Sequence, residues 1–112
     1  MADDCVFCKI GKKVIPSKIQ YEDKDVVAFD DINPKAPIHI LIVPKVHVSS
    51  ISVMNEDEAE VIVSMIKAAK KIAKKRGIKS FRLVFNSGKD AGMEIDHLHL
   101  HLLGGNKLGS MV

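Results

Sequence analysis

Short apolar runs separated by polar turns make up much of the chain, and their pattern predicts β-strands. Five runs are rich in β-branched residues or alternate apolar with polar positions. They are residues 18–22, 26–30, 38–43, 81–85 and 96–103. The polar triplet Asp23-Lys24-Asp25 predicts a hairpin between the first two runs. Five short strands favour a single, mostly antiparallel sheet.

One longer segment follows the three- and four-residue repeat of a helix. Apolar residues recur on this repeat from Ile62 to Ala73, so they line one helix face. Asn55 and Glu58 form a capping-box pattern, which predicts that the helix begins there. Gly77 is the expected C′ residue, because glycine adopts the left-handed conformation that ends helices. The expected fold class is therefore α+β.

Length and composition narrow the possible classes of protein. The chain has 112 residues, 46% of them hydrophobic, which predicts one domain over residues 1–112. No apolar run approaches the roughly 18 residues of a membrane span, and the acidic start does not resemble a secretory signal peptide. We therefore expect a cytoplasmic protein with no membrane partner.

The net charge of +3 has a local origin. Lysines and one arginine crowd the end of the predicted helix, between Lys70 and Lys79. No aromatic residue is interleaved with them as a base-stacking surface would require. A solvated helix end is therefore favoured over a nucleic-acid surface, and no nucleic-acid partner is expected.

Three histidines alternate with leucines in the last predicted strand. In an extended strand His97, His99 and His101 would share one face, roughly 7 Å apart, with the leucines on the other. Each imidazole on such a face needs a polar partner, and their like charges oppose joint protonation, so a chemical site is favoured. They could bind a shared metal ion or act in nucleophilic catalysis, and the spacing does not decide between the two.

Cys5 and Cys8 form a lone Cys-x-x-Cys motif. Two cysteines exclude a disulfide scaffold, and the following sequence lacks the βαβ context of a thioredoxin-like redox site. Buried thiols and a metal site remain as the two alternatives for this pair.

A family resemblance adds to this interpretation. The run His97-Leu98-His99-Leu100-His101-Leu102-Leu103 resembles the signature of the histidine triad (HIT) family. Further segments follow in the order found in the family's Hint branch, which comprises small dimeric nucleoside phosphoramidases. They are Cys5-Val6-Phe7-Cys8-Lys9-Ile10, Ile15-Pro16-Ser17, Phe29-Asp30-Asp31-Ile32, Ala36-Pro37-Ile38-His39, Ile42-Val43-Pro44-Lys45 and Leu103-Gly104-Gly105. The resemblance implies a five-stranded sheet with one long and one short helix, pairing across a homodimer.

The resemblance also implies an activity, namely hydrolysis of the P–N or a related bond of purine nucleoside monophosphate derivatives. His99 matches the histidine that attacks the α-phosphorus and forms a covalent nucleotidyl-histidine; His101 and His39 match the supporting histidines. No cofactor is expected for this catalysis. Histidine at position 101 favours hydrolysis, because the family's nucleotidyl transferases resemble this pattern with glutamine there. The alternatives are a Fhit-like dinucleoside polyphosphate hydrolase and a nucleotide-binding or interaction protein with little turnover.

The resemblance further implies a nucleotide-binding pocket for AMP or GMP derivatives. Asp31 matches the ribose-binding acid, although it could instead be a turn residue, and Asn86 matches a polar residue beside the phosphate. Backbone N–H groups of the glycine-containing segment 88–92, which ends at Gly92, could add donors. The base-binding walls, each of which could equally be core, match Phe7, Ile10, Ile15, Phe29 and Ile32.

Two positions of that pocket depart from the family pattern. Relatives commonly carry glutamine and then a small hydroxyl residue where this chain has Met93 and Glu94. We expect Glu94 to disfavour acyl-phosphate and polyphosphate substrates and to tolerate amine leaving groups.

The cysteine pair also acquires a role through the resemblance. Bacterial Hint relatives with such a pair resemble a zinc site that two histidines complete, and these match His47 and His97. The resemblance therefore implies a structural zinc ion held by Cys5, Cys8, His47 and His97, a set that fills tetrahedral coordination and leaves no open position.

Overall fold

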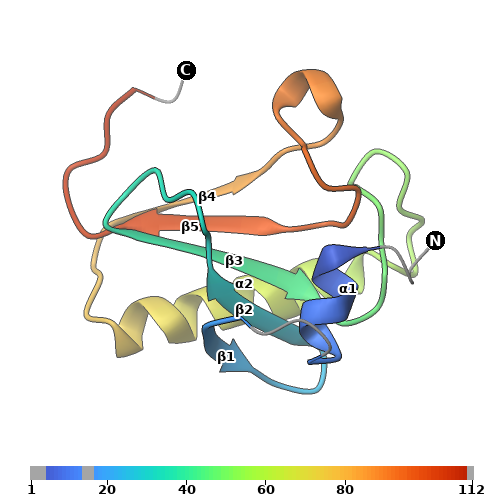
Figure 1. Ribbon diagram of the computed structural model, residues 1–112, viewed down its shortest axis with the longest axis horizontal. Coiled ribbons are helices and arrows are strands. Elements are labelled where there is room, and N and C mark those ends of the chain that lie inside the picture. Colours follow the sequence, from blue (N-terminus) through green and yellow to red (C-terminus); the bar gives the residue numbers. More distant parts are fainter. Residues whose placement is uncertain (1–4, 14–16, 111–112) are drawn as a thin grey trace.

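The computed structural model describes residues 5–13 and 17–110 and contains one antiparallel sheet with a helix on each face (Figure 1). The strands lie in the order β1-β2-β3-β5-β4. The elements are α1 (Val6–Gly11), β1 (Ile19–Glu22), β2 (Val26–Asp30), β3 (Ile38–Pro44), α2 (Glu60–Lys75), β4 (Phe81–Phe85), the 3₁₀ turn η2 (Lys89–Ala91) and β5 (Leu100–Gly104). The α+β fold and the five-stranded sheet with one long and one short helix are confirmed. The homodimer stays a prediction.

Both faces of the central strands are buried, which explains their continuous apolar runs. In β2, Val26 and Ala28 face α2, whereas Val27 and Phe29 face α1. The side chains of β3 divide in the same way, because successive residues of a strand point to opposite faces. The sheet thus separates two apolar clusters, and the smaller one, on the α1 side, adjoins the histidines.

The larger cluster holds α2 against the sheet. Met65, Ala69 and Ile72 of α2 pack in one buried cluster with Leu100 and Leu102 of β5. The leucines of the histidine run therefore lie against the long helix. Among the described residues no helix has the length and apolar character needed to cross a bilayer.

The predicted hairpin of residues 18–22 and 26–30 is present as β1 and β2. These strands pair antiparallel, with an irregularity between Ile19 and Tyr21. The Asp23 carboxylate accepts hydrogen bonds from the backbone N–H groups of Asp25 and Val26, at 2.8 and 3.0 Å. Asp23 therefore fixes the turn that the polar triplet predicted.

The long helix begins later than predicted. The capping box forms, with Asn55 N–H donating to Glu58 Oε1 at 3.0 Å and Glu58 N–H donating to Asn55 Oδ1 at 2.9 Å. It encloses turns with i to i+3 bonds, such as Ala59 N–H to Glu56 O, so regular α-helix starts only at Glu60. The predicted end is confirmed, because Gly77 has a φ of +70°.

The last strand is also shorter than predicted, since residues 96–99 lie outside it. Leu100 pairs with Ile42 of β3 and with Phe85, the last residue of β4, so one neighbour ends there. On the other side Pro44 has no N–H to continue the ladder. Leu98 N–H instead donates to Val48 O at 2.6 Å. His97 and His99 therefore sit on irregular backbone directly before β5.

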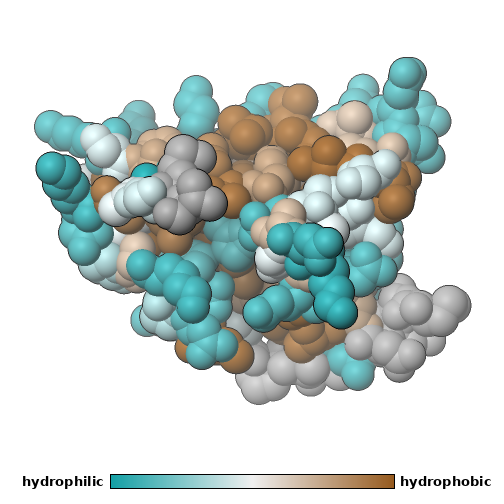
Figure 2. Space-filling model, turned by 90° about the horizontal axis from the view of Figure 1, so that it is seen from above, coloured by the Kyte–Doolittle hydropathy of each residue, from teal (hydrophilic) through white to brown (hydrophobic). Residues whose placement is uncertain are grey.

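The fourth strand forms one edge of the sheet. Figure 2 looks down on the molecule from the β4 side and shows apolar surface among hydrophilic side chains. Phe81 at the start of β4 contributes an exposed aromatic ring to this edge. Strand β5, which carries His101, lies between this edge strand and β3 (Figure 1).

We expect Leu102→Ala to lower the free energy of unfolding by about 2–5 kcal/mol, because it removes buried apolar surface and leaves a cavity beneath α2. Urea denaturation measures the change. Val53→Ala is the control at a residue that is 69% exposed, and it should change the same quantity by less than about 0.5 kcal/mol. Equal effects of the two substitutions would contradict the central position of Leu102.

Candidate active site and metal centre

Three of the five histidines form a row on the α1 side of the sheet. His39 of β3 and His101 of β5 lie on neighbouring strands with ring centroids 5.1 Å apart, and His99 follows at 5.0 Å from His101. The spacing of His99 and His101 is closer than a regular strand would give, because the ladder stops at Leu100. The ring of His97 takes part in a different cluster, described below.

Backbone groups fix the proton positions on His39 and His101. Lys35 N–H donates to His39 Nδ1 at 3.0 Å, so Nδ1 is the acceptor and Nε2 carries the hydrogen. His39 Nε2–H can then donate to His101 Nδ1 at 2.9 Å. The remaining hydrogen of His101 lies on Nε2, a buried atom without a hydrogen-bond partner among the described residues. His101 Nε2–H is therefore a free donor, and the hydrogen bond from His39 determines that the hydrogen of His101 lies on Nε2.

His99 has the complementary arrangement, with a free acceptor. Its Nδ1 lies 2.7 Å from the backbone carbonyl of His97, and a carbonyl can only accept, so Nδ1 carries the hydrogen. Nε2 of the neutral ring is therefore left with its lone pair. The edge of Phe7 contacts this ring, with centroids 5.2 Å apart, and limits its rotation. His99 thus presents a nucleophilic nitrogen next to the free donor of His101.

Burial keeps the supporting histidines neutral. Burial, together with the neighbouring His99 and His39, lowers the pKa of His101 to about 4. Burial also lowers the pKa of His39, although the Asp31 carboxylate, 3.4 Å from His39 Nε2, opposes that change. Because burial prevails, this contact is not an ion pair at neutral pH.

Two adjoining cavities open onto the histidine row. The first, of about 230 Å³, is mostly apolar, and His99 and His101 form part of its wall. Its predicted members are Phe7, Ile10, Phe29, Asp31, Ile32, Gly92 and Glu94. The second, of about 430 Å³, is more polar and adds His39 and Asn86 to Asp31, Gly92, Glu94 and His101. The structure therefore brings most of the predicted pocket together.

The remaining predicted pocket residues are placed differently. Ile32 lies at the rim and is 90% exposed, so it is not a core residue. Met93 lines neither of the two cavities. Ile15 lies outside the described residues.

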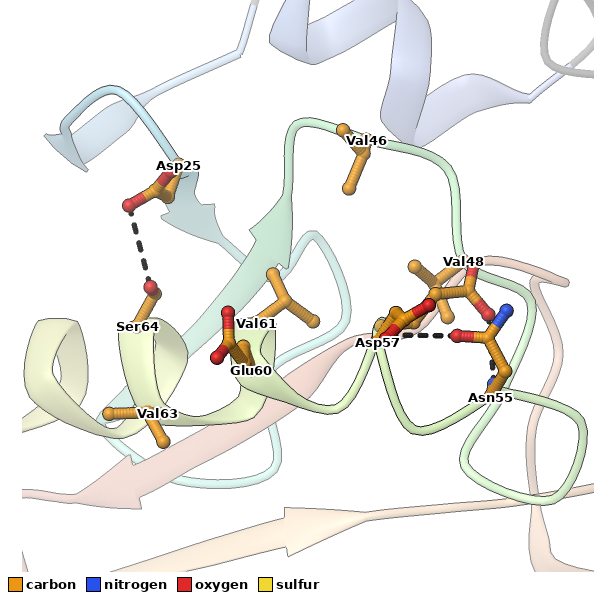
Figure 3. Close-up of a pocket in the computed structure, with 10 residues that line it drawn as sticks. Asp25, Val46, Val48, Asn55, Asp57, Glu60, Val61, Val63 and Ser64 are labelled. Atoms are coloured by element: carbon orange, nitrogen blue, oxygen red, sulfur yellow. Dashed lines mark hydrogen bonds between the residues drawn. The ribbon is translucent and has the colours of Figure 1, made fainter.

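A larger cavity elsewhere carries none of this chemistry. It measures about 730 Å³ and lies between the start of α2 and the segment after β3 (Figure 3). Valines and acidic residues line it, without histidine or cysteine. The smaller cavities at the histidine row are therefore the candidate active site, because the histidines line them.

The other two histidines meet the cysteine pair. Nδ1 of His97 lies 3.2 Å from Cys5 Sγ and 3.4 Å from Cys8 Sγ, and His47 Nδ1 lies 3.2 Å from Cys8 Sγ. All four atoms are within 4.8 Å of one another. Tetrahedral zinc with sulfur and nitrogen ligands separates adjacent ligand atoms by about 3.5 Å. The geometry of these donors fits such an ion.

The protonation of the cluster also fits a metal ion. His97 Nε2 donates to the Pro44 carbonyl at 3.0 Å, which leaves the Nδ1 lone pair facing the thiols. Burial, together with the adjacent Cys5, raises the pKa of the Cys8 thiol to about 11. A cation among the four atoms would instead lower the pKa of the thiols, because a coordinated thiol is deprotonated.

Asp31, His39 and His101 are a second close group of possible ligands. Their facing nitrogens already share the hydrogen bond described above.

Sequence reasoning missed several members of the site. The carbonyls of Pro44 and His97 and the N–H of Lys35 orient three imidazoles, but main-chain groups leave no mark in a sequence. Leu41 also lines the first cavity. The alternation of β3 could have identified it, because residues 39 and 41 share a face.

Comparisons with known proteins show what the chain is similar to. A family model described as scavenger mRNA decapping enzyme C-term binding matches residues 4–111. The purine nucleoside phosphoramidase of Escherichia coli (strain K12) is 41% identical over 114 residues, covering 100% of this chain and 96% of that protein.

Solved structures are similar over most of their length. The HIT family hydrolase from Clostridium thermocellum is 47% identical with a TM-score of 0.93, covering 98% of this chain and 97% of that one. A zinc-bound histidine triad family protein from Mycobacterium smegmatis is 26% identical with a TM-score of 0.82, covering 95% of this chain and 78% of that one. With its histidine run at the start of β5, its fold and its similarity to relatives over nearly its whole length, the chain belongs to the histidine triad (HIT) family.

Proposed function

We propose that the protein hydrolyses the P–N bond of purine nucleoside monophosphate derivatives through a covalent nucleotidyl intermediate on His99. The observation that carries this proposal is the pairing of a free lone pair on His99 Nε2 with the unpartnered donor His101 Nε2–H. The names of two relatives, a purine nucleoside phosphoramidase and a HIT family hydrolase, support the same class of reaction.

The first step is attack by a neutral imidazole on the α-phosphorus. His99 Nε2 forms the N–P bond, while His99 Nδ1–H continues to donate to the His97 carbonyl, whose oxygen stabilises the positive charge that develops on the ring. The P–N bond of the substrate breaks, and the amine leaves with that electron pair and a proton from water. His101 Nε2–H donates to a non-bridging phosphate oxygen, where negative charge is concentrated.

The second step returns the enzyme to its starting state. Water attacks the phosphorus of the nucleotidyl-histidine, the P–N bond to His99 breaks with its electron pair returning to Nε2, and the nucleoside monophosphate is released. The proton that the attacking water loses neutralises the hydroxide left from the first step. His39 supports both steps as a positioning residue, because its Nε2–H holds His101 in the tautomer that leaves Nε2–H free. Asn86 lines the polar cavity and is a further candidate donor to phosphate.

The nucleoside would occupy the first cavity. Phe7, Ile10 and Phe29 offer apolar walls for the base, with the rings of Phe7 and Phe29 5.5 Å apart. Asp31 lines both cavities, and its carboxylate can accept from two neighbouring ribose hydroxyls. A base therefore lies near α1, and its phosphate lies over His99.

We further propose that Cys5, Cys8, His47 and His97 hold a structural zinc ion. When bound, zinc would cross-link α1 to the segments that follow β3 and precede β5, with no open position for catalysis. The zinc-bound relative supports this assignment.

Replacing the proposed nucleophile should abolish turnover. We expect His99→Gln to lower kcat on adenosine 5′-phosphoramidate by at least about a thousandfold, because the described contacts leave no other imidazole of the histidine row with a free lone pair. Mass spectrometry of acid-quenched wild type should show the nucleotidyl adduct, which the variant should lack. An unfolding midpoint equal to that of wild type is the control for folding. Equal rates for the two proteins would refute the mechanism.

The buried neutral state of His101 predicts a dependence of stability on pH. Its pKa of about 4 lies below the ordinary value of 6.5, so the unfolded chain binds the proton more readily. The contribution is complete above pH 6.5 and is lost as the pH falls towards 4. Between pH 7 and pH 5 the free energy of unfolding should fall in both wild type and His101→Asn. We expect the fall to be smaller in His101→Asn by about 1–2 kcal/mol, because the variant lacks this titrating group. Residue-specific NMR titration checks the assignment, and a His101 pKa at or above 6.5 would contradict it.

Purified protein should contain about one equivalent of zinc by elemental analysis. Cys8→Ser should lose the metal and lower the melting temperature, because the cluster loses a ligand and α1 loses its cross-link. Lys9→Ala, in the same helix but outside the cluster, is the matched control and should retain both metal and stability. Wild-type protein free of metal, or Cys8→Ser that retains it, would argue for free thiols.

A further inference from the structure

Glu94 occupies an unusual position for an acidic residue. It lines both cavities beside His101, as do Asp31 and Gly92. It therefore borders the place where the phosphate and its leaving group would lie. A phosphate carries negative charge, so a carboxylate beside it calls for an explanation.

The other acidic residues around the cavities are engaged. Asp31 Oδ1 accepts a hydrogen bond from Asn33 N–H at 2.9 Å, and its Oδ2 faces His39. Asp30 has Lys18 Nζ at 3.8 Å. Within residues 5–13 and 17–110, Glu94 is exposed and has neither a hydrogen bond nor an ion pair. Its charge is therefore available to a ligand.

The balance of charge around the second cavity favours cations. Lys35 is the only lysine or arginine among its described lining residues, whereas Asp31 and Glu94 are both acidic. An anionic leaving group would meet net negative charge here, and a cationic one would be attracted.

We propose that Glu94 is a specificity-determining residue that selects amine leaving groups carrying a second, protonated amino group. This inference rests on the proposed hydrolysis of phosphoramidates. Glu94 takes no covalent part: the P–N bond breaks as His99 Nε2 bonds to phosphorus, and the amine leaves with the electron pair and a proton from water. The carboxylate attracts the distal ammonium group and repels a distal carboxylate or phosphate.

Three adenosine phosphoramidates that differ only at the far end of the amine provide the test. Their leaving groups are 1,3-diaminopropane, propylamine and β-alanine, which place a positive charge, no charge and a negative charge at a similar distance. We expect wild type to favour the diamine over β-alanine by about five- to tenfold in kcat/KM, as for a solvent-screened charge pair. Glu94→Gln should bring that ratio close to one, and added salt should reduce it in wild type.

A neighbouring acidic residue supplies the matched control. Asp90 belongs to the same segment but lines neither cavity, so Asp90→Asn should keep the wild-type ratio. A Glu94→Gln variant that ranks the three phosphoramidates by kcat/KM as wild type does would overturn the inference about Glu94. That result would not contradict the proposed hydrolase function.

A second measurement separates this inference from the proposed function. Absence of His99-dependent turnover of all three compounds would refute the hydrolase. Calorimetric binding of the same compounds to His99→Gln and to the double variant with Glu94→Gln would then decide the role of Glu94. Loss of the preference for the diamine in the double variant supports it, and an unchanged preference refutes it.

Discussion

The geometry of the site depends on His97, a fully buried histidine that makes three contacts at once. The Nε2–H of His97 donates to the Pro44 carbonyl at the end of β3, and its Nδ1 faces the two thiols. Its backbone carbonyl accepts a hydrogen bond from His99 Nδ1–H. The side chain of His97 therefore belongs to the candidate metal centre, and its main chain belongs to the candidate active site. Movement of this residue would change the orientation of the proposed nucleophile without touching it.

Burial and hydrogen bonding act in the same direction on the histidine row. Burial disfavours the charged imidazoles, and the fixed main-chain groups choose one tautomer for each neutral ring. The hydrogen bonds of the row consequently run in one direction. Lys35 N–H donates to His39, His39 donates to His101, and the buried Nε2–H of His101 is left without a partner among the described residues. Apolar residues beneath the rings make this possible, because β3 and β5 bury their alternate side chains against α2.

Much of the fold could be predicted from the sequence, because its signals are local. Alternation and turn residues identified the strands, and the three- and four-residue repeat identified α2. The errors lie where long-range pairing decides. Whether residues 96–99 join the ladder depends on where β3 and β4 end, and whether the capping box starts an α-helix depends on the turns that it encloses.

The candidate site shows the same division. Resemblance to the family identified the residue types that surround the cavities, and the structure brings most of them together. It could not indicate the tautomers, which depend on main-chain groups distant in sequence, such as Pro44 O beside His97. Nor could it show that Glu94 stays unpaired while Asp31 is engaged, because pairing depends on three-dimensional proximity.

Helix α1 contributes both to the candidate metal centre and to the wall of the first cavity, two features that would otherwise vary independently. Its six residues are too few for a stable helix in isolation, so tertiary contacts must hold it in place. Cys8 provides such contacts on one side, and Phe7 and Ile10 form the wall of the cavity on the other. A lineage that lost the cysteines would have to anchor this wall by other packing before it could keep its ligand. Retention of the proposed metal ion and the shape of the proposed base pocket are thus constrained to evolve together.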